Sequence, residues 1–480
     1  MNVLQKIFKN MGLLLLSQII AIVFGFFYTI YMARYLGAEG FGLISFAMAF
    51  TSIFAVITDF GLNTVTTREV SRNKCLTLKY INNVILIKII LVIITLLLVI
   101  ITLDIFKYPQ STLYVVYLFM LSTILSSFVQ NFNSIFQSFQ KMEYQALGVI
   151  VNNTILLCGT FVAIKYSFDV VGFSLIYVTA NFIVLIYSVI VYNLKFLKFN
   201  FPNQNLIDTQ FSINMIKEAF PIFLSALFSV VAFKIDIVML SIIKGDMIVG
   251  TYSASYKLIE ILLFLPAAFT ISILPIFSKM FVKKRALNIL KHSYQFSVKI
   301  LLSIALPITI LIMVFSNDII LFLYSLKYSD SVFVLQILIW TIPPSFLTYV
   351  LGTLLVSINK QQIVLKTTII VTVFNIFMNL ILIPYLSYIG AAIVTVLTQF
   401  ILLIIYYISV SHIFHRIKLS ETIIKPVVAS LVMLLLLYIA LRINNVFMII
   451  LAILSYLIVL LKIKTFNTEE IFLFKSLLDK

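Results

Sequence analysis

The stretch from Phe220 to Met280 reads FPIFLSALFSVVAFKIDIVMLSIIKGDMIVGTYSASYKLIEILLFLPAAFTISILPIFSKM and decides the fold. It consists of two long apolar segments joined by the short turn Ile243–Gly250. The ionisable residues inside the apolar runs are Lys234, Asp236, Lys257 and Glu260. An ionisable side chain at membrane depth is costly and usually faces a bundle interior or a wet cavity, so these are candidate functional residues. The stretch predicts a helical hairpin in a membrane transporter.

Composition places the whole chain in the same class. Of its 480 residues, 62% are hydrophobic and 11% are charged, against about 45–50% and about 25% in soluble globular domains. This composition indicates an all-α integral membrane protein with many spans. The two cysteines, Cys75 and Cys158, fit neither a disulfide framework nor a metal-ligand spacing. We therefore expect no metal and no cofactor.

Apolar runs of roughly 20 residues are long enough to cross about 30 Å of hydrocarbon as helices. The sequence contains fourteen such runs, and both chain ends are then on one side of the membrane. The predicted spans are 11–33, 41–66, 80–103, 112–138, 144–164, 171–193, 218–241, 251–277, 296–316, 331–357, 363–383, 389–410, 423–441 and 446–463.

The distribution of positive charge among the loops predicts the topology. Of the 34 Lys and Arg, 25 fall in the terminal segments and alternate loops that include the N-terminus, and 6 fall in the opposite loops. Cytoplasmic loops carry the excess of Lys and Arg, so both termini are predicted to be cytoplasmic. The net charge of +17 is then a signal of topology and of contact with membrane lipids, not of nucleic-acid binding.

The longest polar break in the chain is Lys195–Lys217, which separates six predicted helices from eight. A polar, proline-containing break of this kind is typical of a linker. We predict an N-lobe over 1–205 with helices 1–6, a C-lobe over 206–411 with helices 7–12, and helices 13–14 with a cytoplasmic tail over 412–480.

Internal repetition predicts the architecture of the two lobes. Three short matches occur in order along the chain at offsets of 208, 218 and 219 residues. Each six-helix copy begins in the cytoplasm, so the repeats are parallel and the substrate is expected between the lobes. The matching pairs are Gly37–Gly42 with Gly245–Gly250, Val171–Gly172 with Ile389–Gly390, and Phe139–Lys141 with Ile358–Lys360.

Several short motifs resemble one known family. They are Phe220–Ser225, Lys234–Leu240, Gly250–Leu258 and Leu274–Pro275 in the hairpin, and Arg34–Gly42 and Asp59–Leu62 near the start of the chain. Together they resemble the polysaccharide-transporter branch of the multidrug/oligosaccharidyl-lipid/polysaccharide exporter superfamily, the Wzx-type flippases. The likeness covers roughly residues 10–460.

The resemblance implies a V-shaped, two-lobed bundle in the cell membrane. It also implies a function, which is to flip a lipid-linked oligosaccharide from the cytoplasmic to the outer leaflet by alternating access. The implied partners are a glycan linked to polyprenyl phosphate or diphosphate, membrane lipids, and proteins of glycan assembly.

The hairpin supplies the first candidate site. Asp236 and Lys257 are each expected about 8–9 Å from the same end of two antiparallel helices, at about 1.5 Å per residue. Glu260 lies three residues after Lys257, on nearly the same helix face. In one interpretation these residues form an ion-pair cluster that locks the hairpin. In the other, Lys257 attracts the carrier phosphate while Asp236 or Glu260 holds the lysine or exchanges a coupling cation.

Four more charged residues complete the set of candidates. Lys88 lies about 12 Å inside the third helix, where it either lines the N-lobe wall or pairs with a neighbouring helix. Arg34 is at an interface, so it either extends to the headgroups or guides phosphate. Lys234 points away from Asp236 and is a third candidate cation for the substrate. Asp59 is expected to cap a helix or to pair with Arg68.

Amides on the fourth and fifth helices are open to two interpretations as well. They either contact sugar hydroxyls or form hydrogen bonds between helices. These residues are Gln130, Asn131, Asn133, Gln137, Asn152 and Asn153.

An enzyme is not expected, because the chain has neither acidic pairs in an early outer loop nor a Gly-rich nucleotide motif with Lys and Ser or Thr. The alternatives that remain are a multidrug or metabolite exporter of the same fold and an integral-membrane glycan polymerase.

Overall fold

A computed structural model describes residues 3–196, 208–282, 287–414, 420–443, 446–463 and 465. The described residues are helical, with short turns between helices and no strands. By backbone contacts they divide into two units, Met1–Ser253 and Ala254–Lys480. The first contains α1 (Val3–Asp59), α2 (Leu62–Arg72), α3 (Thr77–Ile105), α4 (Gln110–Ser138), α5 (Met142–Lys165), α6 (Val170–Lys195), α7 (Thr209–Lys244) and the start of α8 (Asp246–Leu262).

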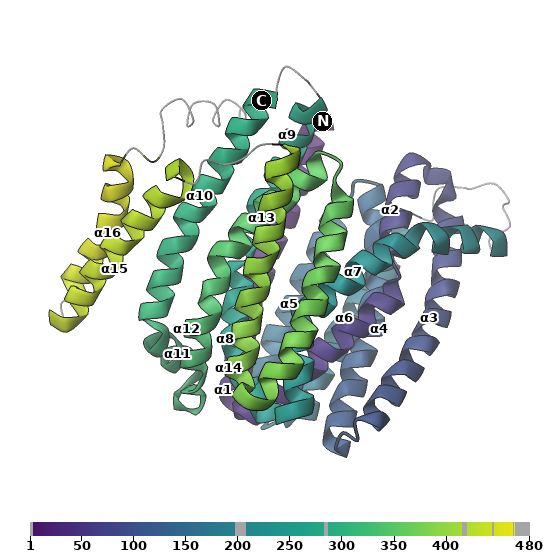
Figure 1. The fold of residues 1–480 in the computed structure, drawn as a ribbon. Coiled ribbons are helices and arrows are strands. Elements are labelled where there is room, and N and C mark those ends of the chain that lie inside the picture. The colour runs from purple at the N-terminus through teal and green to yellow at the C-terminus, as the bar shows by residue number, and fades with distance from the viewer. Residues whose placement is uncertain are drawn as a thin grey trace. The chain divides into compact units, whose positions relative to one another are not determined.

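The second unit continues α8 and contains the remaining helices (Figure 1). These are α9 (Phe264–Val282), α10 (Leu287–Val314), α11 (Ser316–Tyr324), α12 (Ser331–Leu338), α13 (Ile342–Ser357), α14 (Gln361–Ile413), α15 (Lys425–Ile443) and α16 (Val446–Lys462). Short helical turns are η1 (Lys74–Leu76), η3 (Leu326–Tyr328), η4 (Ile339–Thr341) and η5 (Ser420–Ile424).

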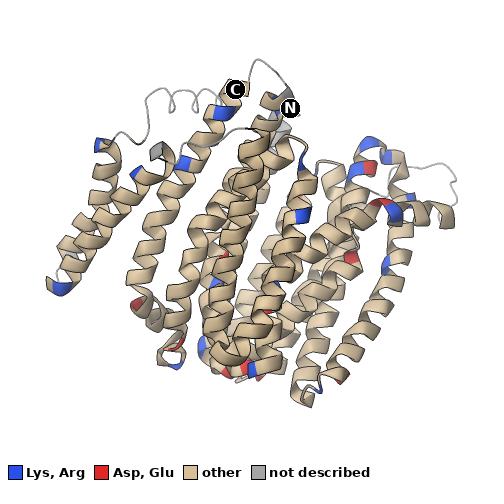
Figure 2. Ribbon diagram, viewed as in Figure 1, with Lys and Arg blue, Asp and Glu red and all other residues tan. Residues whose placement is uncertain are grey.

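The prediction of fourteen spans is confirmed. Eleven helical stretches of the described residues are long and apolar enough to cross a membrane, and α16 is a shorter apolar helix. Two of the eleven each join two predicted spans at a kink, α1 at Gly37 and α14 at Ser387. Figure 2 shows Lys and Arg mainly at helix ends, with long uncharged lengths of helix between them.

One predicted span ends earlier than expected. The second span was predicted over 41–66, whereas α1 ends at Asp59 and α2 begins at Leu62. Phe60 and Gly61 between them have φ values of 50° and 76°, a left-handed conformation that interrupts a right-handed helix. The predicted span ran on through Val65, although most residues of α2 are polar and the break falls at a glycine.

Within the first unit, α1 packs against α4, α5 and α7, and α4 packs against α6. Its buried core includes Val84 of α3, Phe136 of α4 and Ala219 of α7. Within the second unit, α13 packs against α9, α10 and α14. There α15 and α16 lie side by side and are joined to α10 by a cluster that includes Ile310 and Met433 (Figure 1).

The contact division at Ser253 differs from the predicted lobe boundary at 205, because α7 packs against α1, α2 and α3 of the first unit. This division does not test the repeats, so the lobes 1–205 and 206–411 stay a prediction. Most of the predicted linker (197–207) and most of the tail lie outside the described residues.

Candidate functional site

The two glycine-framed turns of the predicted repeats have the same backbone conformation. Gly37 has φ 72° and ψ −178°, and Gly245 has φ 85° and ψ 174°. Glycine adopts a positive φ at little cost, whereas most other residues avoid it. The conformation explains why glycine opens both turns, and it supports their pairing in the sequence.

The same two turns contact each other through the glycines that close them. A Cβ added to Gly42 would lie 2.7 Å from the carbonyl carbon of Asp246, and a Cβ added to Gly250 would lie 2.7 Å from that of Ala38. Because each Cβ would clash with backbone atoms, only glycine permits this approach. The contact is reciprocal, since Ala38 and Asp246 occupy equivalent positions in the two turns. The backbone of the turn before α8 is therefore in direct contact with the backbone that follows the kink in α1.

The segment just after α1 contacts the first half of α7. The ring of Phe60, just after α1, stacks on that of Phe223 of α7, with centroids 4.3 Å apart and 13° between the planes. A Cβ added to Gly61 would lie 2.9 Å from the carbonyl oxygen of Ala219. Within the first unit, contacts therefore close both ends of the region where α1 and α7 pack.

Polar contacts fix the first turn of α7 against α3. The Asp208 carboxylate accepts a hydrogen bond from the backbone N–H of Phe211 at 3.0 Å and thereby caps α7. Lys79 of α3 donates to the other Asp208 oxygen at 2.8 Å, and this bond lowers the pKa of Asp208 below its ordinary value. The Asn83 side-chain oxygen accepts from the Asp208 backbone N–H and from the Ser212 hydroxyl.

Lys88 is fully buried, with 0% of its side chain exposed. Its Nζ lies 3.3 Å from Oδ1 of Asp59. It also donates to the Asn63 side chain at 3.2 Å and to the carbonyl oxygen of Ser127 at 2.7 Å. A buried ammonium needs such a set of acceptors, because burying an unpaired charge is costly. Of the two interpretations of Lys88, the structure favours pairing with neighbouring helices over a place on an open wall.

The expected partner of Asp59 was wrong. Asp59 pairs with Lys88, whereas Arg68 binds Glu69 within α2 and Glu218 of α7. The break at Phe60 and Gly61 separates Asp59 from α2, whereas the predicted span treated residues 41–66 as one helix. The Asp59 side chain remains 33% exposed.

The hairpin residues form two interactions that the structure describes. Asp236 is buried, and one of its carboxylate oxygens accepts a hydrogen bond from the Tyr252 hydroxyl at 3.2 Å. Lys257 and Glu260 are partly exposed and form an ion pair at 3.1 Å within α8. The lysine–glutamate contact agrees with the expectation that both lie on one helix face. The ion pair of Asp236 with Lys257 stays a prediction.

The two remaining cationic candidates differ in exposure. Arg34 is exposed on α1, three residues before the kink at Gly37. Lys234 is half-buried on α7. Their roles toward a substrate stay predictions.

The amides of α4 and α5 bond largely within the protein. Gln137 of α4 donates to Gln145 of α5 at 2.9 Å, and Asn133 donates to Gln130 at 3.4 Å. Asn131 is fully buried, and neither polar atom of its side chain has a hydrogen-bond partner among the described residues. The Gln137 contact favours a hydrogen bond between helices, whereas the Asn133 contact lies within α4.

Sequence reasoning missed a second group of buried amides, on the two halves of α14. Asn379 donates to Asn375 at 3.0 Å, and Asn375 donates to the Thr398 hydroxyl at 3.3 Å across the kink. All three side chains are buried. The signal was present in the sequence, because two asparagines four residues apart share one face of an apolar helix.

No group of three or more His, Cys, Asp or Glu side chains that could hold a metal ion occurs among the described residues. Two histidines lie three residues apart in the sequence, His412 and His415, and the second lies outside the described residues.

Two protein families match the chain. The model of the family described as polysaccharide biosynthesis protein matches residues 7–281, and the MatE model matches residues 221–381. No curated protein sequence matches the chain.

Solved structures share the fold at low sequence identity. The chain resembles the lipid II flippase MurJ in an inward closed conformation with a TM-score of 0.76 and 18% identity, over 94% of this chain and 98% of that one. It resembles an inward-facing MATE family multidrug resistance transporter of the MOP superfamily with a TM-score of 0.63 and 16% identity, over 82% and 95%. For the Vibrio cholerae MATE transporter VcmN the values are 0.58 and 13%, over 85% and 97%.

The fold and the family matches define a multi-pass membrane protein of the multidrug/oligosaccharidyl-lipid/polysaccharide exporter superfamily, a class of flippases and exporters. The chain belongs to the polysaccharide biosynthesis protein family of that class. The resemblance noted in the sequence is thereby confirmed.

Proposed function

We propose that this protein flips a lipid-linked oligosaccharide, a precursor of a polysaccharide, from the cytoplasmic to the outer leaflet of the cell membrane. The observation that carries the proposal is the polysaccharide biosynthesis family match over residues 7–281. The fold shared with a lipid II flippase over 94% of the chain supports the same kind of substrate, a sugar head on a lipid carrier. The excess of Lys and Arg in alternate loops supports cytoplasmic termini.

Alternating access is the proposed mechanism. The reciprocal contact of Gly42 with Asp246 and of Gly250 with Ala38 supports it, because two backbones in direct contact can seal one side and separate as rigid helices. A disulfide between cysteines placed at Gly40 and Met247 should hold these turns together and block transport. Unimpaired flipping by fully cross-linked protein would refute this mechanism.

The candidate site residues are assigned three proposed roles. Lys257, Arg34 and Lys234 are proposed to attract the anionic phosphate of the carrier. Asp236 and Glu260 are proposed to neutralise Lys257 or to exchange a coupling cation. Lys88 is fully buried and pairs with Asp59, so we propose a structural rather than a substrate-binding role for this pair.

Deletion of the gene tests the proposed substrate class. A lipid-linked oligosaccharide should then accumulate on the cytoplasmic face, and re-expression of the protein should clear it. An unchanged lipid-linked pool would refute the proposal.

The second candidate is export of a drug or metabolite, and the MatE match over 221–381 favours it. Greater sensitivity to cationic drugs in the deletion strain, with a normal lipid-linked pool, would select this function.

A further inference from the structure

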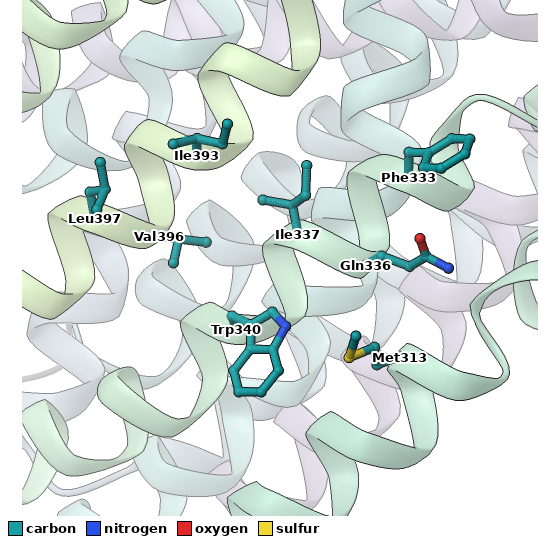
Figure 3. A pocket seen from close by; sticks show the side chains of 8 residues that line it. All are labelled: Met313, Phe333, Gln336, Ile337, Trp340, Ile393, Val396 and Leu397. Atoms are coloured by element: carbon teal, nitrogen blue, oxygen red, sulfur yellow. The ribbon is translucent and has the colours of Figure 1, made fainter. Parts of the chain in front are cut away.

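The second unit contains a cavity of about 370 Å³ with almost entirely apolar walls (Figure 3). It lies between the end of α10, the consecutive turns of α12 and η4, and the second half of α14. Phe333, Gln336 and Trp340 form one wall, and Ile393 and Leu397 form the facing one. Its volume is within the range of small-molecule sites, about 300–1,000 Å³. None of the residues considered for transport lines it.

The cavity lies at membrane depth. Its walls belong to three stretches that are each apolar and long enough to span, namely Leu287–Val314, Ser331–Ser357 and Gln361–Ile413. Met313 is the last residue but one of α10, so the cavity extends to the end of that span, where the hydrocarbon meets the headgroups. Its apolar walls at this depth suit the hydrocarbon chain of a lipid better than water.

Two side chains bring polar atoms to these walls. Gln336 donates a hydrogen bond from Nε2 to the Ser316 hydroxyl at 2.9 Å. The indole N–H of Trp340, by contrast, has no hydrogen-bond acceptor among the described residues, and 41% of this residue is exposed. Figure 3 shows its nitrogen turned toward the other side chains of the cavity. An N–H group without an acceptor in hydrocarbon is costly, so an acceptor is expected from outside the protein.

We propose that this cavity binds one acyl chain of an ester-linked phospholipid, whose ester carbonyl oxygen accepts the hydrogen bond of Trp340. The apolar walls receive the chain, and the neutral carbonyl supplies the acceptor. Tryptophan is enriched at the boundary of hydrocarbon and headgroups, where its ring is apolar and its N–H is polar. A polyprenyl phosphate has no ester carbonyl, so it would leave the N–H of Trp340 without an acceptor.

The chain has a single tryptophan, so its intrinsic tryptophan fluorescence reports on this cavity alone. The full-length protein is reconstituted in vesicles with increasing fractions of a phospholipid brominated on its acyl chain, which quenches tryptophan on contact. The background lipid is either an ester-linked phospholipid or its ether-linked analogue, which lacks the carbonyl. Polyprenyl phosphate is added as a competitor in a third series.

The fraction of brominated phospholipid that gives half-maximal quenching should be lower in ether-linked than in ester-linked background lipid. The reason is that the ether lipid, which lacks the carbonyl, competes poorly for the cavity. The expected difference is about twofold to tenfold, as for one neutral hydrogen bond. Val396→Phe fills the cavity and should make the two curves coincide. Val373→Phe, an exposed position on α14 outside the cavity, should preserve the difference. Size-exclusion profiles check that both variants are folded.

Coincident curves in the unaltered protein would overturn the proposal, since the quenching would then report bulk lipid only. Stronger competition by polyprenyl phosphate than by the ester phospholipid would also overturn it, in favour of the carrier lipid.

Discussion

Replacement of Asp59 by alanine should destabilise the first unit, because it leaves the buried Lys88 ammonium without its carboxylate partner. The Lys88 ammonium has no exposed surface, and Asp59 is the carboxylate that pairs with it, at 3.3 Å. Breaking a fully buried ion pair costs about 3–5 kcal/mol. Here Asp59 is one third exposed, and Asn63 and the Ser127 carbonyl still accept hydrogen bonds from the ammonium. We therefore expect a smaller cost, about 2–3 kcal/mol, close to one hydrogen bond to a charged group.

The assay is thermal unfolding in detergent, followed by size-exclusion chromatography of the protein that remains folded. Asp59→Ala should lower the apparent Tm, and adding Lys88→Met should restore it, because the second change removes the unpaired charge. Arg68→Ala is the control, since its exposed ion pairs are each worth less than about 1 kcal/mol. An unchanged Tm in Asp59→Ala, or no recovery in the double variant, would show that the carboxylate does not stabilise Lys88.

Three further predictions test the turns, the hairpin and the topology. Gly42→Ala should lower the free energy of unfolding by about 1–3 kcal/mol, because the added methyl group overpacks the facing turn, and it should raise thiol labelling of a cysteine placed at Met247. Gly12→Ala, where the added methyl group has open space, should do neither. Equal effects of the two variants would contradict the glycine contact. Lys257→Ala should abolish flipping while the amount of protein in the membrane stays normal. Lys257→Arg should keep part of the flipping activity because the positive charge survives. Full activity of Lys257→Ala would exclude a role for this lysine. A cysteine at Gln204 should resist an impermeant reagent in intact cells, and its labelling from outside would overturn the topology.

The helices and the glycine turns could be predicted from the sequence, because both depend on local chemistry. Apolar length determines a span, and the left-handed φ of Gly37 and Gly245 favours glycine at those positions. The reciprocal contact of the turns could not be predicted, because the five-residue glycine spacing shows a repeated turn and not that the two copies meet.

The candidate site was less predictable than the fold. The pairing of Asp59 with Lys88 joins the end of α1 to α3, and such a tertiary contact cannot be read from either stretch alone. Asn375 and Asn379 are four residues apart in the sequence, which places them on one helix face and allows their hydrogen bond to each other. The hydrogen bond of Asn375 to Thr398 in the other half of α14 is a tertiary contact that the spacing does not predict. The cavity at Trp340 requires three separate helical segments to meet, and no single stretch of sequence contains that information.

The most direct test of the central claim is the movement of the sugar head across the bilayer. Vesicles that contain the purified protein and the lipid-linked oligosaccharide in both leaflets are treated from outside with a glycan-cleaving enzyme. The proposed function predicts that the inner-leaflet pool becomes fully accessible with the unaltered protein and stays protected in protein-free vesicles. Continued protection of that pool in the presence of folded protein would contradict a flippase.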